Sequence, residues 1–153
     1  ALVRHDAVFD AYSVIGGSGN DTLQSYPYSF GGRRVLEGGP GDDVLEGGDG
    51  NETIDGGPGA DRIAGGYGTD IVTYADRAAP VSLSLDGIGN DGEKEEGDSI
   101  AADVEDLRGG KGDDSLSGNA KPNVLDGGPG SDSCAGQSGV DAATTCETIT
   151  GVP

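Results

Sequence analysis

Acidic side chains recur every nine residues along much of the chain, each at the end of a glycine-rich turn. The pattern is G-G-x-G-x-D, as in GGPGDD at residues 38–43 and GGKGDD at residues 109–114. Carboxylates offer only oxygen donors, and glycine-rich turns free backbone carbonyls beside them. Oxygen-only donor sets with flexible geometry favour a large hard cation. The recurring acids therefore predict calcium sites.

The complete unit has nine residues and reads G-G-x-G-x-D-x-U-x, where U is apolar. It occurs at residues 16–24, in an unbroken series over 38–73 and in a second series over 109–144. Glycine adopts positive φ without steric cost, so the first six residues predict a tight turn. The last three predict a short strand with one inward apolar residue. These inward residues are Leu23, Leu45, Ile54, Ile63, Val72, Leu116, Leu125 and Cys134.

This repeat resembles the RTX, or haemolysin-type calcium-binding, nonapeptide family. The resemblance implies an all-β fold, a right-handed parallel β-roll (a β-helix or solenoid), in which two repeats make one coil and the turns form a file along each edge. Acids eighteen residues apart then stack in pairs. Two carboxylates about 5 Å apart repel by roughly 3 kcal/mol at an effective dielectric near 20, and a divalent cation between them reverses the sign.

The stacked acids and turn carbonyls give the predicted ligand set for about four to six Ca²⁺ ions. The alternative is that each acid only caps its own turn, as Asp does in loops generally. The predicted side-chain ligands are Asp21, Asp43, Glu52, Asp61, Asp70, Asp114, Asn123, Asp132 and Asp141. The predicted backbone carbonyl ligands are Gly38, Pro40, Asp42, Gly56, Gly109, Lys111, Asp113 and Gly127.

The nine-residue phase extends beyond the clear repeats. Residues 29–37, SFGGRRVLE, form a degenerate repeat that follows a four-residue insertion at 25–28, with Leu36 inward and Arg34 where the acid belongs. Arg34 should lie over Glu52 and supply positive charge directly; the alternative is a solvated surface arginine. Nine residues before Gly109, the segment 100–108 places Glu105 at the acid position and Leu107 inward.

The stretch between the two series departs from the repeat. Val81, Leu83 and Leu85 alternate with serines, which predicts a strand. Residues 86–98 are rich in glycine and acid, and form either an irregular calcium site or a solvated acidic loop; the acids concerned are Asp86, Asp91, Glu93, Glu96 and Asp98. We expect one continuous roll that bulges here. The predicted organisation is a single domain over 1–153, with repeats at about 16–73 and 100–144, an irregular acidic insertion over 74–99 and a C-terminal cap over 145–153.

Composition favours a chain that needs a cation to fold. Gly (31) and Pro (7) are abundant and the net charge is −19, which is typical of disordered chains unless bound ions offset the repulsion. Such acidity disfavours nucleic acid and membrane-surface partners. There is no long apolar run for membrane insertion, and residues 1–10 lack the regions of a signal peptide. Cys134 and Cys146, the only cysteines, predict a disulfide that staples the end of the roll, with free buried thiols as the alternative.

These features predict a secreted, monomeric calcium-binding repeat module, because sites of this type need calcium at about 10⁻⁴ to 10⁻³ M. The alternative is a calcium-dependent carbohydrate-binding or adhesion module, with a polysaccharide or cell-surface partner, accessory to a polysaccharide-acting enzyme. Its best sugar-stacking candidates are Tyr26, Tyr28 and Phe30, which equally suit a lid over the core. We expect no enzyme activity and no catalytic residues, since His5 is the only histidine and no G-x-S-x-G motif is present.

Overall fold

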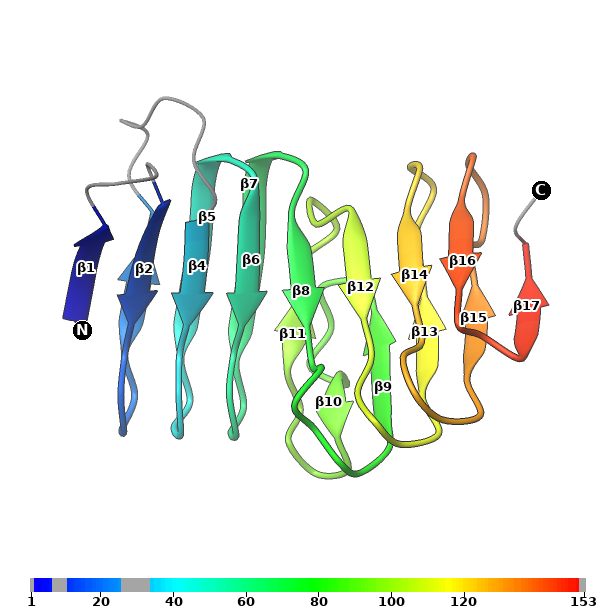
Figure 1. Cartoon of the computed structure of the whole chain (residues 1–153), viewed down its shortest axis with the longest axis horizontal. Helices are drawn as coiled ribbons and strands as arrows, with labels where there is room; N and C mark the ends of the chain where they lie inside the picture. The colour runs from blue at the N-terminus through cyan, green and yellow to red at the C-terminus, as the bar shows by residue number, and fades with distance from the viewer. Residues whose placement is uncertain (1, 7–10, 26–33, 152–153) are drawn as a thin grey trace.

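The computed structural model describes residues 2–6, 11–25 and 34–151. These residues form seventeen short β-strands and no helix, stacked into an elongated two-layered coil (Figure 1). Nearly all neighbouring strands are parallel. The all-β parallel β-roll predicted from the repeats is confirmed.

One layer is a single sheet of eight strands that runs the length of the molecule in the order β1-β2-β4-β6-β8-β12-β14-β16. Its strands are parallel except for the first pair, β1 and β2. The bounds are β1 Leu2–Asp6, β2 Ala11–Ile15, β4 Arg34–Glu37, β6 Glu52–Asp55, β8 Ile71–Thr73, β12 Asp106–Arg108, β14 Val124–Asp126 and β16 Ala142–Thr144.

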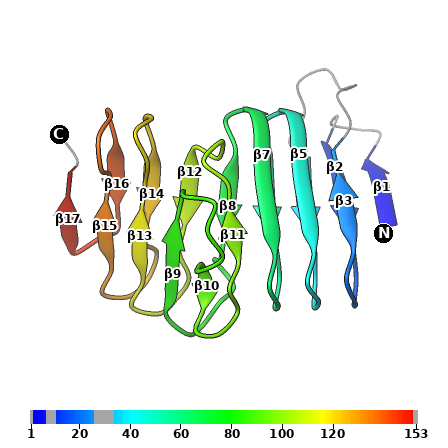
Figure 2. The ribbon, with the colours of Figure 1, turned by 180° about the vertical axis from the view of Figure 1, so that it is seen from behind.

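The opposite layer is divided into two sheets, of orders β11-β7-β5-β3 and β10-β9-β13-β15-β17 (Figure 2). Its strands are parallel except for β9 with β10. The bounds are β3 Thr22–Gln24, β5 Val44–Gly50, β7 Arg62–Gly68, β9 Val81–Ser84, β10 Gly92–Glu93, β11 Ser99–Ile100, β13 Ser115–Ser117, β15 Ser133–Ala135 and β17 Thr148–Thr150.

The core lies between the two layers, and the last three residues of each clear repeat contribute one inward apolar side chain to it. All eight inward residues predicted from the repeat are at most 1 % exposed. The strand register stacks them in columns, with Leu45 between Leu23 and Ile63 in one layer. Strand β9 is also confirmed, and it buries Val81 and Leu83. Further buried residues are Val14, Leu36, Tyr74, Leu85, Ile100, Val104 and Leu107.

The roll crosses the irregular stretch differently in its two layers. In the eight-stranded sheet β12 pairs with β8 on one side and β14 on the other, so Leu107 joins Val72 to Leu125. In the opposite layer the sheet is interrupted, with β11 ending one part and β9 in the other. The expectation of a continuous roll with a bulge is therefore confirmed for one layer only.

The C-terminal end is closed by a disulfide between Cys134 and Cys146, which confirms the predicted pair. Cys134 is an inward residue of β15, and the chain after Cys146 forms β17 alongside that strand. None of the described residues belongs to a helix long and apolar enough to span a membrane.

Candidate metal centre

Most of the repeat acids are buried, in files along the edges of the roll. In several of them one carboxylate oxygen accepts a hydrogen bond from the backbone N–H of the residue at the same repeat position one coil earlier. Asp43 Oδ1 accepts from Asp21 N at 2.7 Å, and Asp61 Oδ1 accepts from Asp43 N at 2.8 Å. The same contact joins Glu52 N to Asp70 at 2.8 Å, Asp114 N to Asp132 at 2.8 Å and Asn123 N to Asp141 at 3.0 Å. The predicted pairing of acids eighteen residues apart is thus seen in both series.

The second carboxylate oxygen of most of these acids is buried without a hydrogen-bond partner. These oxygens are Asp43 Oδ2, Glu52 Oε2, Asp61 Oδ2, Asp70 Oδ2, Asp132 Oδ2 and Asp141 Oδ2. An unpaired buried polar atom costs about 1–3 kcal/mol, and more when it is charged. A periodic row of them is the arrangement expected of oxygens that bind a cation.

The first glycine of the repeat, which has no side chain, lets the second carboxylate oxygen approach closely; at Asp114 this oxygen also accepts from Gly110 N at 2.6 Å. A Cβ on Gly38 would lie 2.5 Å from Asp43 Oδ2 and 2.2 Å from the carbonyl oxygen of Gly56 in the next coil. At Gly109 both distances, to Asp114 Oδ2 and to the Gly127 carbonyl oxygen, are 2.5 Å. A carboxylate and a carbonyl therefore converge on one space, and their all-oxygen chemistry fits calcium.

Burial disfavours the charged state of two carboxylates in the files, Asp61 and Asp70. Burial, together with the nearby charges of Asp98 and Asp43, raises the pKa of Asp61 to about 7. Burial also raises the pKa of Asp70 to about 6, with the charge of Glu52 contributing. A bound divalent cation would stabilise the ionised carboxylates and lower both pKa values.

The predicted carbonyl ligands lie in the turns and face the neighbouring coil. The carbonyls of Gly38 and Pro40 accept hydrogen bonds from Gly17 N at 3.0 Å and Gly19 N at 2.7 Å. The Gly56 carbonyl accepts from Gly39 N at 3.0 Å. Each carbonyl has a second lone pair, so these bonds leave a ligand role open as a prediction.

The other predicted carbonyl residues lie in equivalent turns. Asp42 and Asp113 also bridge coils through their side chains, which accept from Ala60 N and Ser131 N. Lys111 donates its backbone N–H to the Arg77 carbonyl at 2.9 Å, and Gly109 N donates to Asp126 O at 2.8 Å.

Within the described residues no three Asp, Glu, His or Cys side chains converge as a metal cluster. Side-chain ligands along the files come in pairs, so any further protein ligands would be backbone oxygens.

Two acids outside the clear repeats continue the files. Asp98 Oδ1 accepts from Asp61 N at 2.7 Å, and Glu105 Oε2 accepts from Asp70 N at 3.0 Å. The nine-residue phase anticipated Glu105 but not Asp98. The signal for Asp98 was Ile100, an apolar residue two positions later that pairs with Ile63 as a repeat residue would.

The acidic segment 86–98 is not a simple solvated loop. Asp91 and Asp98 are 2 % and 0 % exposed, so that alternative is wrong for these two residues. Asp98 Oδ2 accepts from the Tyr74 hydroxyl at 2.6 Å, and Asp91 accepts from the backbone N–H groups of Ser84 and Ile100. The remaining acids of the segment are exposed or partly exposed: Asp86, Glu93, Glu95 and Glu96.

The arginine in the degenerate repeat takes the place of an acid. Arg34 pairs with Glu52 in the strand register, and Arg34 Nη1 lies 2.9 Å from Glu52 Oε1. Their side chains are only 5 % and 0 % exposed, and Arg34 also donates to the Asp49 carbonyl of the same turn. The predicted contact is confirmed, and the alternative of a solvated arginine is wrong.

The residues considered for sugar binding or catalysis receive no structural support. Tyr26, Tyr28, Phe30 and the side chain of His5 lie outside the part that the structure describes.

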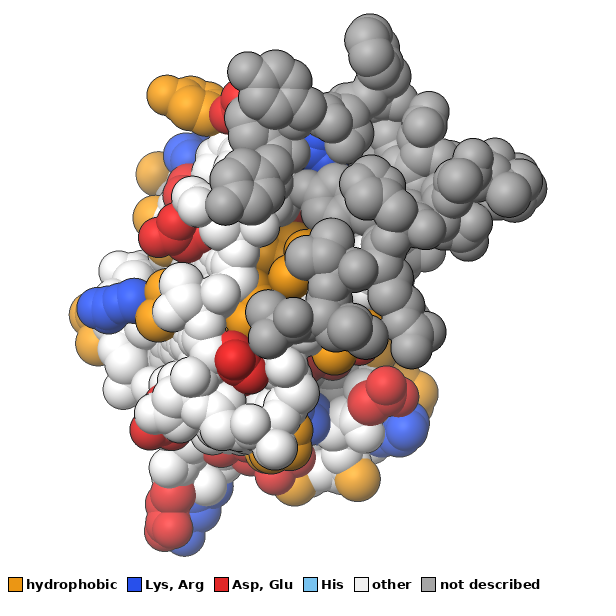
Figure 3. Space-filling model, turned by 90° about the vertical axis from the view of Figure 1, so that its left-hand side faces the viewer, with side chains coloured by type: hydrophobic (Ala, Val, Ile, Leu, Met, Phe, Trp, Pro, Cys, Tyr) orange, Lys and Arg blue, Asp and Glu red, His pale blue; other side chains and the backbone are white. Residues whose placement is uncertain are grey.

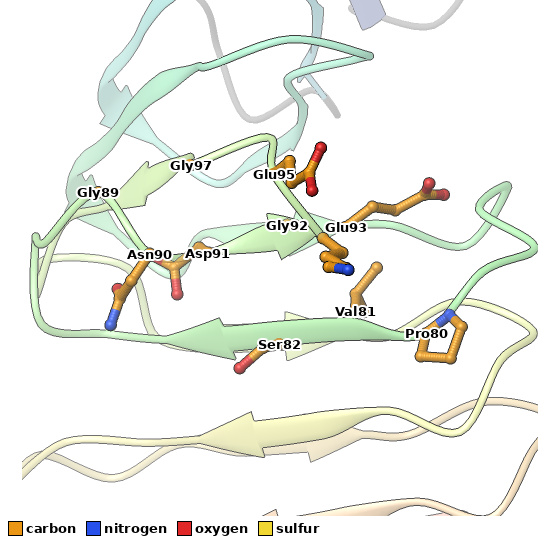
Figure 4. A pocket seen from close by; sticks show the side chains of 11 residues that line it. Pro80, Val81, Ser82, Gly89, Asn90, Asp91, Gly92, Glu93, Glu95 and Gly97 are labelled. Carbon is orange, nitrogen blue, oxygen red and sulfur yellow. The ribbon is translucent and has the colours of Figure 1, made fainter.

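An open groove of about 520 Å³ lies beside β9 and β10, lined by residues that include Pro80, Asp91 and Glu93 (Figure 4). None of the described residues that line it is aromatic. Viewed from the N-terminal side, Asp and Glu side chains lie beside Lys and Arg at several places on the surface (Figure 3).

Comparison with known families agrees with this geometry. The family model of the RTX calcium-binding nonapeptide repeat matches residues 13–25, 35–63, 46–75 and 108–142. No curated protein matches the chain. The family matches cover more than half of the sequence and contain most of the stacked acids, so the chain belongs to the RTX calcium-binding nonapeptide repeat family.

Proposed function

We propose that this chain is a secreted calcium-binding module, one β-roll domain over residues 1–153 that folds as Ca²⁺ fills its turns. The observation that carries the proposal is the row of buried carboxylate oxygens without hydrogen-bond partners beside the first glycines of the repeats. Calcium is the ion that repeats of this family bind.

The energetics favour folding that depends on the ion. At a free calcium concentration ten times the dissociation constant, each site contributes about 1.4 kcal/mol to stability, so four sites supply about 6 kcal/mol. This is comparable with the whole stability of a domain, about 5–15 kcal/mol. A core with about one apolar side chain per nine residues cannot readily offset the backbone entropy and the stacked charges without that contribution.

The calcium requirement and the disulfide support the proposal that the chain is secreted. Sites of this type fill at about 10⁻⁴ to 10⁻³ M calcium, which is an extracellular level. The Cys134–Cys146 disulfide also suits an oxidising compartment. The proposal assigns no catalysis, and no described feature favours the carbohydrate-binding alternative over it.

The proposal is tested by counting bound ions. Equilibrium dialysis against millimolar calcium, with metal analysis of the protein compartment, should give about four to six Ca²⁺ per chain. Magnesium at the same concentration should bind poorly, because it requires octahedral geometry and dehydrates reluctantly. A chain that binds one calcium or none would contradict the proposal.

A further inference from the structure

The segment after the last matched repeat has no glycine-rich turn, yet it packs as another half-coil. Strand β17 runs parallel to β15, with Ile149 opposite Cys134. The backbone N–H groups of Glu147 and Thr148 both donate to the Asp132 carbonyl at 3.0 Å. This segment therefore lies directly on the last acid of the file that begins at Asp114.

Glu147 occupies the place that the next repeat's acid would take. Its Oε2 accepts a hydrogen bond from Asp132 N at 2.6 Å, just as Asp132 Oδ1 accepts from Asp114 N at 2.8 Å. Glu147 belongs to no G-G-x-G-x-D motif and lies beyond the family match, which ends at residue 142.

A backbone carbonyl of the same segment takes the place that a repeat glycine's carbonyl has in the regular coils. A Cβ on Gly127 would lie 2.6 Å from Asp132 Oδ2 and 2.7 Å from the Thr145 carbonyl oxygen. In the regular coil below, a Cβ on Gly109 would meet Asp114 Oδ2 and a glycine carbonyl at matching distances. The Thr145 carbonyl thus replaces the carbonyl of a repeat glycine.

An unpartnered oxygen points to a ligand at this position. Asp132 is 1 % exposed, and its Oδ2 is buried without a hydrogen-bond partner. It lies on the side where the Thr145 carbonyl approaches Gly127.

The disulfide holds the Thr145 carbonyl and the Glu147 carboxylate, the two oxygen ligands of the terminal segment, against the roll. Cys146 lies between Thr145 and Glu147 and is bonded to Cys134 in the core of β15. Thr145 has a φ of 53°, unusual for a residue other than glycine, and its hydroxyl accepts from Gly128 N at 2.8 Å.

We propose that Asp132, Glu147 and the Thr145 carbonyl form a calcium site at the C-terminal end of the roll, held in place by the Cys134–Cys146 disulfide. The site rests on the proposed function, because it extends the same file by one coil. It differs from the repeat sites in that its outer ligands come from outside any repeat.

The test is the number of ions bound by the full chain carrying Glu147→Gln. Glutamine keeps an oxygen to accept from Asp132 N, so the coil remains closed while the charge is lost. The variant should bind one Ca²⁺ fewer than the native protein in equilibrium dialysis, with an unchanged β-signal in saturating calcium. Glu95→Gln, which removes an exposed acid outside the files, is the matched control and should bind the native number.

Two measurements on the unmodified sequence complete the test. We expect calcium to slow amide hydrogen exchange over residues 145–150, and to do so over the repeats as well. Reduction of the disulfide with dithiothreitol should weaken the binding of one ion at least tenfold. That change corresponds to about 1.4 kcal/mol.

The outcomes separate this site from the proposed function. If the native chain binds no calcium, the proposed function fails and this site fails with it. The site is refuted if the native chain binds several ions and Glu147→Gln binds the same number. It is also refuted if calcium does not change the rate of amide hydrogen exchange over residues 145–150. In either case Glu147 only caps the backbone. Unchanged affinities after reduction would refute the positioning role of the disulfide.

Discussion

Replacing Arg34 with aspartate tests whether its guanidinium takes the place of the ion that we propose for the other coils. Arg34 Nη1 lies 2.9 Å from Glu52 Oε1, and the two side chains are 5 % and 0 % exposed. Removing one partner of a buried ion pair costs about 3–5 kcal/mol. Arg34→Asp should therefore be destabilised by about that amount at low calcium, where two carboxylates would face each other.

The same substitution restores the repeat acid and should create one more site. An additional ion steepens the dependence of unfolding free energy on calcium by about 1.4 kcal/mol per tenfold increase in concentration. The difference in unfolding free energy between the native protein and Arg34→Asp should therefore shrink by that amount for each tenfold rise in calcium.

The assay is urea unfolding at several fixed calcium concentrations, followed by circular dichroism. Arg62→Asp is the matched control, because Arg62 is exposed and the charge change is identical. Its unfolding free energy should stay within about 0.5 kcal/mol of native, with the native slope. An unchanged slope for Arg34→Asp would show that position 34 is not equivalent to a repeat acid, and an unchanged stability at low calcium would refute the importance of the buried pair.

Three further predictions follow from the stacked acids. Asp43→Asn should lower the number of bound calcium ions by up to two, because Asp43 contacts both Asp21 and Asp61, whereas Asp21→Asn should lower it by one; equal losses in dialysis would contradict shared ligation. Gly38→Ala should abolish at least one calcium site, since its Cβ would lie 2.2 Å from a backbone oxygen. Gly89→Ala, whose Cβ would have its nearest contact at 3.2 Å, should bind the native number of ions. If calorimetric titration finds the same number of sites in both variants, the first glycine of the repeat is not needed for binding. In calcium-free buffer the β-signal should strengthen as pH falls from 7.5 to 5, and a weaker signal at pH 5 would contradict the carboxylate assignment. The folded-state pKa of Asp61 is raised from 3.8 to about 7, so the folded state binds the extra proton and this stabilisation is lost as pH rises toward 7.

Much of the fold was predictable because the nine-residue period sets the strand register and inward face together. Once Leu45 is assigned inward, its stacking on Leu23 and Ile63 follows from the coil length. Arg34 was placed over Glu52 by counting alone. The burial of that pair was not predictable, because the sequence does not show how the rest of the chain covers the turn.

The coils whose residues depart from the nine-residue spacing were not predicted in detail. Ile100 and Leu107 are both inward residues but only seven apart, so counting back from the second series lost the phase before Asp98. The position of Glu147 in the file was not predicted, because a half-coil can stack by backbone pairing and a well-placed oxygen alone. Neither feature requires the glycine motif by which the repeats are recognised. The antiparallel strand β1 likewise carries no repeat signal.

A calcium titration of the metal-depleted protein, followed by far-ultraviolet circular dichroism at pH 7.5, tests the central claim most directly. The account predicts a largely unfolded chain in chelator that gains β-structure cooperatively as calcium rises to about millimolar, with little response to magnesium. A native β-signal that persists unchanged in excess chelator would contradict it.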